Sequence, residues 1–236
     1  MPSQDAYGRN HNTLIPVSED LYYFAPVPIV YHEVDAVGLD ERHAEIRECA
    51  RKAFSEAVLE VPDVRHINDL GDPPESLPKV WSEQQNAAVG VWHRVPTNSF
   101  LSLQNPAVAW LRNLIITRYQ SALAKLGNKE ERHVNITESW IQFYKNTDYK
   151  VLHNHERYGP PYPLFRWAGS YYVDDGAPDP TMPYSGVLSF RVREQNYLFR
   201  PKAGLLLLWP SEILHEVHPF YGERNRIAIN FNISCE

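Results

Sequence analysis

The chain has 236 residues, of which 43% are hydrophobic and 22% are charged, and its formal net charge at pH 7 is −6. This length and apolar share allow a full hydrophobic core, so we expect residues 1–236 to form a single domain. The negative charge and the lack of a basic run argue against nucleic acid as a partner, because phosphate binding needs clustered lysine and arginine.

The N-terminal residues 1–20 are polar and lack the apolar centre of a secretion signal, so they are predicted to be an irregular lead. No later segment reaches the roughly 18 apolar residues of a membrane span. The two cysteines, Cys49 and Cys235, do not make a disulfide framework. We therefore expect a cytoplasmic protein with a small-molecule substrate and no membrane partner, and the sequence leaves room for a homodimer.

Residues 21–34 favour β-structure, but Pro26 and Pro28 interrupt them, which is typical of an edge strand. From Asp40 apolar residues recur at steps of three and four, which predicts an amphipathic helix with Asp40 as its N-cap. Residues 61–97 are rich in proline, glycine and polar residues and are predicted to be a long loop.

A short strand near residues 89–95 is the only regular element expected in that loop. A second helix is predicted after it, because Asn105 can cap Pro106 at the first helical position and Gly127 can end the helix. Residues 21–130 are thus expected to supply helical and loop support for a sheet.

The C-terminal half changes to strand patterns. The predicted strands cover residues 133–146, 151–156, 170–174, 186–193, 197–200, 205–209 and 226–233. A segment rich in proline and aromatic residues, 156–169, separates the second strand from the third and is a candidate lid or substrate wall. These patterns predict a mainly β protein with packing helices.

Three histidines have the spacing of a metal site. In an extended chain His153 and His155 point to the same side, as two ligands of one metal must. His215 follows after 215 − 155 = 60 residues, enough for about four short strands and their turns. Neutral imidazoles suit iron, copper, nickel or zinc. Other histidines, such as His43, are predicted to be structural.

The last predicted strand alternates cleanly from Arg226 to Ile233. Arg226, Ala228, Asn230 and Asn232 share one face, and isoleucine and phenylalanine occupy the other. A guanidinium on an inward polar face needs an anionic partner, because a buried charge without one costs several kcal/mol. A ligand carboxylate would serve, and a structural salt bridge to Glu138 is the alternative.

The order of motifs resembles the iron(II)- and 2-oxoglutarate-dependent oxygenase superfamily, in particular the branch described as putative 2OG-Fe(II) oxygenase. The motifs are W-x-x-x-Y at 140–144, H-x-H at 153–155, G-S-Y-Y-V at 169–173, G-x-L-x-L-W-P at 204–210, H-x-V-x-P at 215–219 and E-R-x-R-I-A-I-N-F-N at 223–232. The resemblance covers roughly residues 100–233. It implies a double-stranded β-helix (jelly-roll or cupin-like) core over residues 131–236, with Fe(II), 2-oxoglutarate and O₂.

By the same resemblance, His153 and His215 are metal ligands and Arg226 binds the distal carboxylate of 2-oxoglutarate. Two positions depart from the family pattern. His155 stands where the family has aspartate or glutamate, and Ala228 stands where a serine or threonine is frequent.

The ligand set therefore stays open at one position. His155 could be the third ligand, or a carboxylate from Glu156, Asp174 or Asp175 could reach the metal, or water could complete a site with two protein ligands. A hydroxyl from Tyr144 or Tyr172 could replace the missing serine. Asn230, on the face of Arg226, is a further candidate for binding the keto acid.

The sequence therefore predicts a non-haem Fe(II) dioxygenase that hydroxylates, or otherwise oxidises, a C–H bond of a small molecule such as an amino acid or another carboxylate-bearing metabolite. Candidate substrate contacts in and beside the segment 156–169 are Arg157, Tyr158, Arg166 and Trp167. Two alternatives remain: a cupin-type enzyme with three histidines that uses no 2-oxoglutarate, and a non-catalytic jelly-roll binding module.

Overall fold

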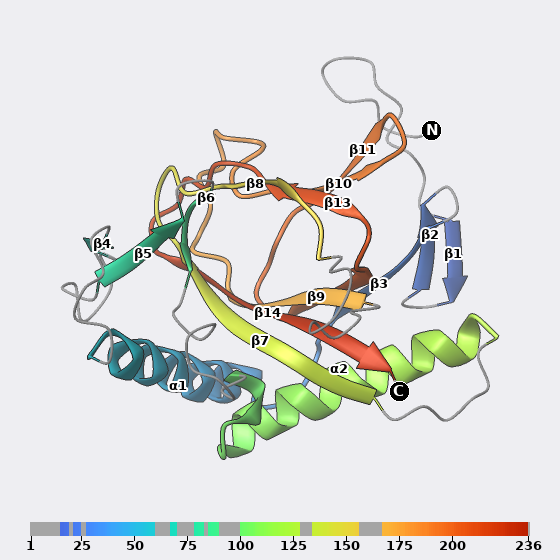
Figure 1. Cartoon of the computed structure of the whole chain (residues 1–236), viewed down its shortest axis with the longest axis horizontal. Coiled ribbons are helices and arrows are strands. Elements are labelled where there is room, and N and C mark those ends of the chain that lie inside the picture. Colours follow the sequence, from blue (N-terminus) through green and yellow to red (C-terminus); the bar gives the residue numbers. More distant parts are fainter. Residues whose placement is uncertain are drawn as a thin grey trace, which may run out of the picture.

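The computed structural model describes residues 15–18, 21–24, 27–59, 67–69, 78–82, 85–89, 100–127, 134–155 and 167–235. This part of the chain forms two antiparallel sheets and two long α-helices (Figure 1). The elements are β1 Ile15–Ser18, β2 Leu21–Phe24, β3 Val27–Glu33, α1 Leu39–Leu59, β4 Ile67–Asp69, β5 Pro78–Ser82, β6 Gln85–Val89, η2 Phe100–Ser102, α2 Pro106–Lys125, β7 Val134–Tyr144, β8 Lys150–His153, β9 Trp167–Asp174, β10 Leu188–Val192, β11 Gln195–Phe199, β12 Leu205–Pro210, β13 Leu214–Val217 and β14 Arg226–Cys235.

The chain passes back and forth between the two sheets. The large sheet has the order β1-β2-β3-β12-β9-β14-β7-β6-β5-β4, and the small sheet has the order β11-β10-β13-β8. From β7 onward most successive strands join opposite sheets, with only the hairpin β10 and β11 staying together. This winding is a double-stranded β-helix, and the predicted mainly β fold with packing helices is confirmed.

The centre of the large sheet is β14, which pairs with β7 over its whole length and with β9 on its other side. Its alternation is as the sequence predicts. Ile227, Ile229, Phe231 and Ile233 pack into the core under the helices. The polar face of β14 therefore points the other way, into the space between the two sheets.

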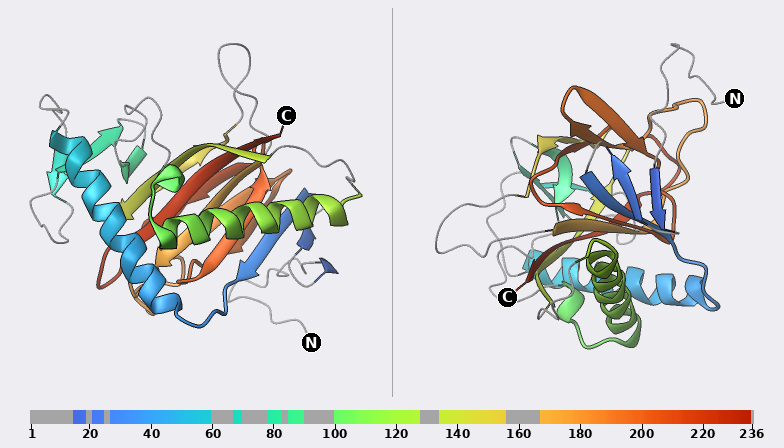
Figure 2. Two further views of the ribbon diagram at one scale, coloured as in Figure 1. Left: turned by 90° about the horizontal axis from the view of Figure 1, so that it is seen from below. Right: turned by 90° about the vertical axis from the view of Figure 1, so that its right-hand side faces the viewer.

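Helices α1 and α2 cover the outer face of the large sheet (Figure 2). Helix α2 begins as predicted, because the side chain of Asn105 accepts hydrogen bonds from Ala107 N and Val108 N at 2.8 and 3.1 Å. Leu111 and Ile115 of α2 are fully buried against the sheet. No described helix is long and apolar enough to cross a membrane.

Three neighbouring strands of the large sheet approach one another closely at Gly169 of β9. A Cβ atom placed on this glycine would lie 2.5 Å from the ring of Phe231 and 2.7 Å from the carbonyl oxygen of Leu207. Since real Cβ atoms do not come so near, only glycine fits between β12 and β14 at this level. Glycine here lets the strands that flank the inner space lie at their normal separation.

The N-terminal half holds more strand than the sequence indicates. Residues 15–18, expected to belong to an irregular lead, form β1, and the expected edge strand 21–34 is two strands, β2 and β3. β3 is not an edge, because it lies between β2 and β12. The 61–97 region contains β4, β5 and β6 where a loop with one strand near 89–95 was predicted.

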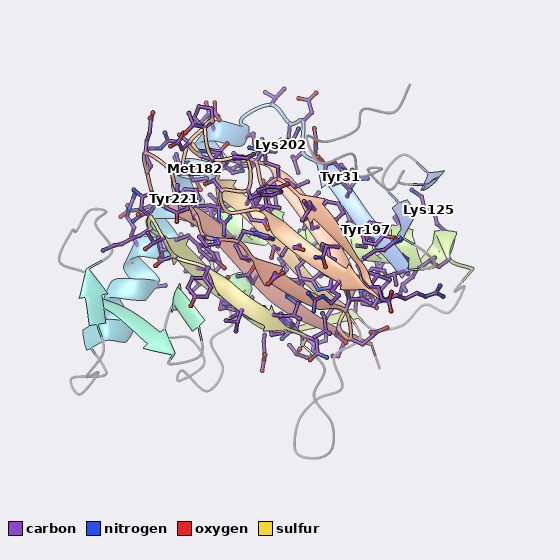
Figure 3. All side chains as sticks on the ribbon, turned by 90° about the horizontal axis from the view of Figure 1, so that it is seen from above. Tyr31, Lys125, Met182, Tyr197, Lys202 and Tyr221 are labelled. Atoms are coloured by element: carbon purple, nitrogen blue, oxygen red, sulfur yellow. The ribbon has the colours of Figure 1, made fainter. Side chains whose placement is uncertain are left out.

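Tertiary pairing explains these differences. β3 carries Ile29 and Val30, which are both buried, and it pairs with the leucine-rich β12, whose Leu205 to Leu208 are all fully buried. At the end of β3, Glu33 pairs with Lys202 at 2.5 Å and also accepts a hydrogen bond from Tyr31, on the surface that Figure 3 shows. Half-exposed ion pairs of this kind contribute little, so the leucine strand is what fixes β3.

His43 of α1 lies under the large sheet and bonds to Tyr171. The distance from its Nε2 to the Tyr171 hydroxyl oxygen is 2.7 Å, and the histidine is 3% exposed. Burial lowers the pKa of His43 from 6.5 to about 4. The predicted structural role of His43 is in keeping with this position.

We predict that His43 makes folding sensitive to acid. Between about pH 6.5 and pH 4 the unfolded chain binds a proton that the folded state does not, so stability is complete above this window and falls as pH falls through it. In His43→Gln, urea unfolding at several pH values should show a smaller loss over the same window. Tyr171→Phe, which keeps the imidazole, should retain the wild-type dependence, and an equal slope in His43→Gln would contradict the assignment.

Candidate metal centre

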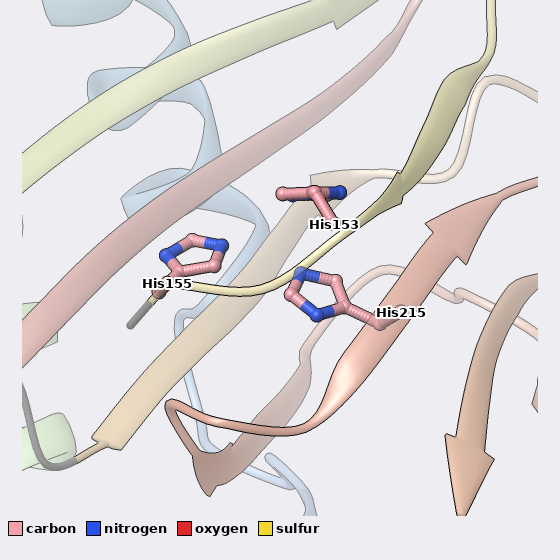
Figure 4. Close-up of side chains that lie close together, drawn as sticks. All are labelled: His153, His155 and His215. Atoms are coloured by element: carbon pink, nitrogen blue, oxygen red, sulfur yellow. The ribbon is translucent and has the colours of Figure 1, made fainter. Parts of the chain in front are cut away.

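Three histidines converge at one end of the space between the sheets (Figure 4). His153 ends β8 and lies directly opposite His215 of β13, while His155 follows β8 by two residues. One ligand nitrogen from each ring can be chosen so that all three lie within 4.8 Å of one another. The structure therefore brings together the three residues that the sequence singles out as a metal site.

Each of the three rings has an oxygen at its Nδ1. His153 Nδ1 lies 2.8 Å from the carbonyl oxygen of Val151, and His215 Nδ1 lies 2.9 Å from that of Ile213. A carbonyl oxygen can only accept, so Nδ1 carries the proton in both rings and Nε2 keeps its lone pair. Such a contact fixes both tautomer and ring orientation, as metal sites require.

The third ring is fixed by a side chain instead of the backbone. His155 Nδ1 lies 2.6 Å from Asn232 Oδ1, and Asn232 Nδ2 donates to Glu138 Oε2 at 3.0 Å. Because the amide nitrogen faces the carboxylate, its oxygen must face the imidazole, which gives His155 the same tautomer as the other two. A carboxylate therefore stands one amide away from His155.

Burial favours the neutral form of two of the three imidazoles. Burial lowers the pKa of His153 to about 4, and it lowers the pKa of His215 well below its ordinary value of 6.5. The charge of Lys150 acts in the same direction on both. Neutral imidazole is the form that binds metal ions.

Two tryptophans hold the rings in place. Trp140 stacks on His155, with 5.5 Å between ring centroids and 19° between planes, and Trp209 meets His215 edge-on at 5.0 Å. These bulky neighbours leave the imidazoles little freedom to rotate and shield them from water. The site is therefore rigid before any ligand binds, which favours metal binding.

The histidines line a pocket between the sheets with an empty volume of about 400 Å³, including its open mouth. Its wall comprises Trp140, Gln142, Tyr144, Lys150, His153, His155, Gly169, Ser170, Tyr172, Leu188, Trp209, His215, Val217, Arg226, Ala228 and Asn230. No aspartate or glutamate is among these described residues, whereas two cations, Lys150 and Arg226, are. The pocket is built to receive negative charge.

Arg226 lies in the pocket wall at the start of β14 and is 2% exposed. Its guanidinium carbon lies 4.0 Å from the centroid of the Tyr144 ring, and one terminal nitrogen donates to the carbonyl of Gly186. A Cβ on Gly186 would lie 2.5 Å from that nitrogen, so glycine makes room for the guanidinium. Its Nε has no hydrogen-bond partner in the described structure.

The predicted salt bridge between Arg226 and Glu138 does not form. Glu138 bonds to Asn232 instead, and no described carboxylate pairs with the guanidinium. In the described structure Arg226 is thus a buried cation that contacts a carbonyl oxygen, three aromatic rings and the Tyr144 hydroxyl, none of which is an anion. Cation–π contacts offset part of the cost of burying it, and an anionic ligand would offset the rest.

The other predicted cofactor residues lie in the same wall. The Tyr144 hydroxyl donates to Gln142 Oε1 at 2.8 Å, and Asn230 Nδ2 donates to the same oxygen at 2.6 Å. Burial raises the pKa of Tyr144 and of Tyr172, so both hydroxyls stay protonated. Gln142 Nε2 remains a buried donor without a partner in the described structure, available to a ligand in the pocket.

Two of the alternative carboxylates lie elsewhere. Asp174 pairs with Arg224 at 3.0 Å and accepts a hydrogen bond from Gly176 N, and Asp175 accepts one from Ala177 N. They stabilise the turn after β9 and do not line the pocket. Glu156, the third alternative, lies outside the described residues.

The predicted substrate contacts are mostly beyond what the structure describes. Arg157, Tyr158 and Arg166 lie outside the described residues. Trp167 is described, and it does not line the pocket, because its ring packs edge-on against Tyr119 of α2 at 5.7 Å. The strand β9 begins at Trp167 instead of Ser170, and its parity turns this indole toward the helices.

Sequence reasoning missed two residues of the wall. Trp209 was assigned only to a buried strand, yet its ring contacts His155 and His215. Lys150 was missed because regular alternation places it on the face opposite His153. A lysine beside a predicted metal-binding strand was the only signal available for it.

Residues 138–232 match the family described as "Putative 2OG-Fe(II) oxygenase". The matched stretch contains His153, His155, His215 and Arg226. Over these residues the chain is similar to that family. The chain is an oxidoreductase of the 2-oxoglutarate-dependent class, which uses Fe(II), 2-oxoglutarate and O₂. The match favours this class over the two alternatives that dispense with 2-oxoglutarate or with catalysis.

The oxygenase shares its fold with solved structures of low sequence identity. A prolyl-4-hydroxylase from Pseudomonas putida has a TM-score of 0.58 at 16% identity, over 90% of this chain and 95% of that chain. AviO1 from Streptomyces viridochromogenes Tue57 has a TM-score of 0.54 at 13% identity, over 87% and 89%. A collagen prolyl hydroxylase from Paramecium Bursaria Chlorella virus-1, in complex with 2OG, has a TM-score of 0.52 at 15%, over 86% and 94%. A comparison with curated proteins finds no match.

Replacing Asn232 with leucine should weaken metal binding by the oxygenase by about 10- to 100-fold, because His155 loses the acceptor that fixes its tautomer and its link to Glu138. Titration of the metal-free protein with Co(II), followed by optical absorption, measures this. Thr137→Val removes only a hydrogen bond to the backbone carbonyl of Asn232 and is the matched control. An unchanged dissociation constant in Asn232→Leu would mean that His155 is not held through this amide.

Proposed function

We propose that this oxygenase binds Fe(II) through His153, His155 and His215, binds the distal carboxylate of 2-oxoglutarate through Arg226, and hydroxylates a C–H bond of a small carboxylate-bearing molecule. The observation that carries the proposal is the arrangement of the pocket. Three imidazoles line the same wall as a buried arginine that has no acidic partner in the described structure.

The donor set fits a divalent first-row metal. Each ring offers Nε2, because its Nδ1 donates to a backbone carbonyl oxygen in His153 and His215 and to the side chain of Asn232 in His155. The set carries no negative charge, unlike one with a carboxylate ligand. The protein ligands would therefore leave the full charge of Fe(II) to be balanced by the ligands that enter the pocket, which favours anions.

The arginine fits a carboxylate. Its guanidinium is buried, its Nε has no partner, and its other contacts are a carbonyl and aromatic faces that do not neutralise it. A bidentate carboxylate is the usual partner of such a group. Tyr172 pairs with Ala228 from β9 and Tyr144 pairs with Arg226 from β7, so either hydroxyl could replace the one that Ala228 lacks.

The described side chains would position the reactants and exclude water. When bound, the metal and the keto acid supply the oxidising power for C–H hydroxylation, with release of succinate and CO₂. Trp140 and Trp209 wall off the histidines, so that a bound substrate and not solvent meets the reacting centre. Arg226 would set the angle at which the keto acid reaches the metal.

A small acidic substrate is supported by the charge of the pocket wall, because no described aspartate or glutamate lines it. Two of the proteins with this fold are named as prolyl hydroxylases, one of them a collagen prolyl hydroxylase, so a peptide is the competing class of substrate. The positive wall of this pocket favours a molecule that itself carries an acid group.

Replacing Arg226 with alanine should weaken 2-oxoglutarate binding by roughly 100-fold, because a desolvated charge pair is lost. Anaerobic titration of the Fe(II) protein with 2-oxoglutarate measures this through the visible charge-transfer band that should need both additions. Arg224→Ala removes an exposed arginine two residues away and should leave the band unchanged. Co(II) affinity serves as the test that Arg226→Ala is folded. Equal bands in wild type and Arg226→Ala would remove Arg226 from the cofactor site.

Small carboxylic acids should raise the rate of succinate formation from 2-oxoglutarate, because a bound substrate couples the oxidation to product. The screen compares free amino acids and their N-acetyl derivatives with proline-containing peptides of about ten residues, and Arg226→Ala provides the background rate. Stimulation by peptides alone would show that the small-molecule assignment is wrong and leave the oxygenase assignment intact.

A further inference from the structure

Lys150 is a second cation in the pocket wall and has no part in the function proposed above. It begins β8 opposite Val217, whereas His153 ends β8 opposite His215. Three steps along β8 therefore match two steps along β13, so β8 contains a bulge of one residue. Regular alternation would turn residues 150 and 153 to opposite faces, and the bulge turns both into the pocket.

The ammonium of Lys150 is buried without a counter-charge. The residue is 9% exposed, and within the described structure its side chain has no hydrogen bond or ion pair. Burial alone lowers its pKa to about 8, so it remains a cation at pH 7. A buried lysine without an anionic partner costs several kcal/mol of folding free energy, which is a large fraction of the stability of a typical domain.

Lys150 and Arg226 are separate positions. Lys150 belongs to the small sheet, and Arg226 belongs to the large sheet, where Tyr144, Tyr172 and Phe220 surround it. Lys150 shares β8 with His153, and Val217, its partner on β13, lies two residues from His215, so Lys150 stands on the histidine side of the pocket. An anion on Lys150 would therefore lie beside the metal centre and not beside the arginine.

The charges of the ligands point to a third anionic group. Under the proposed function, one carboxylate of 2-oxoglutarate lies at the metal and the other lies on Arg226. Both carboxylates of the keto acid therefore already have a partner. With no aspartate or glutamate in the described wall and no carboxylate among the three proposed protein ligands, Lys150 adds a positive charge that this assignment leaves without an anion. A further anion is needed to bring the filled pocket toward neutrality.

We infer that Lys150 binds the carboxylate of the oxidised substrate and so selects small organic acids over their uncharged counterparts. This inference rests on the proposed function, because it assigns 2-oxoglutarate to the metal and Arg226. Lys150 is then a specificity-determining residue. It would anchor the acid group beside the metal centre, where it also fixes which C–H bond of the substrate faces the reacting position.

The test uses two pairs of probes that differ only in charge: isobutyrate with isobutyramide, and N-acetylglycine with N-acetylglycinamide. Each is titrated anaerobically into the complex of the full-length protein with Fe(II) and 2-oxoglutarate at constant ionic strength, and the shift of the charge-transfer band gives its dissociation constant. In wild type at least one acid should bind about tenfold or more tightly than its amide.

Three variants isolate the role of Lys150. Lys150→Met keeps the length of the side chain without the charge and should abolish the preference for the acid, while Lys150→Arg should retain it. Lys202→Met, which removes an exposed lysine, should behave as wild type. The affinity of Lys150→Met for 2-oxoglutarate should change less than about threefold, which also shows that this variant is folded.

Two outcomes would overturn the inference. If neither acid is preferred over its amide in wild type, Lys150 is not a carboxylate site. If Lys150→Met weakens 2-oxoglutarate binding as much as Arg226→Ala does, Lys150 belongs to the keto-acid site. Failure of the proposed function looks different, because no band would form in wild type. The probes would then be titrated into the Co(II) protein, where the same acid preference and its loss in Lys150→Met decide on Lys150 alone.

Discussion

In the described structure, the wall of the pocket between the two sheets carries buried positive charge and no buried negative charge. Arg226 enters from the large sheet and Lys150 from the small one, and the described wall between them contains no acidic side chain. Neither cation can be stable there by protein contacts alone, since aromatic faces and one carbonyl do not neutralise a charge. Binding of an anionic ligand would therefore stabilise the folded protein by neutralising these cations. A loss of stability in the ligand-free protein is usual for a preorganised binding site.

The double-stranded β-helix offsets the free-energy cost of burying these two cations. The helix-side core of leucine, isoleucine and phenylalanine is fully buried and separate from the pocket, so the large sheet is held in place without help from the polar face. β14 lies at the centre of that sheet and presents both faces at once: Ile227 and Ile229 to the core, Arg226 and Asn230 to the pocket. A strand whose apolar face is held by the core can carry energetically unfavourable buried polar groups on its other face.

Sequence alone predicted those features that follow regular periodicity. The alternation of β14, the cap of α2 at Asn105 and the three histidines are all placed as the pattern indicates. It failed where a bulge or a strand boundary changes parity. The extra residue in β8 turns the side chain of Lys150 into the pocket. β9 begins at Trp167 and not at Ser170, and the ring of Trp167 faces the helices. Neither feature can be read from an alternation of apolar and polar residues with a period of two. Strands β4 to β6 were missed because their regularity comes from pairing with neighbours and not from their own composition.

The position of Glu138 explains in physical terms how His155 can stand where the family has a carboxylate. A negative charge is still present near the site, because Glu138 accepts a hydrogen bond from Asn232, which in turn accepts one from His155. The amide of Asn232 and the ring of His155 separate this carboxylate from the metal position, so it can orient and polarise His155 without neutralising the metal directly. A metal held by three neutral rings is a stronger electrostatic attractor for anions than one held by two rings and a carboxylate. Under the proposed function, the three histidines, Arg226 and Lys150 would all act in the same direction and favour substrates that carry a negative charge.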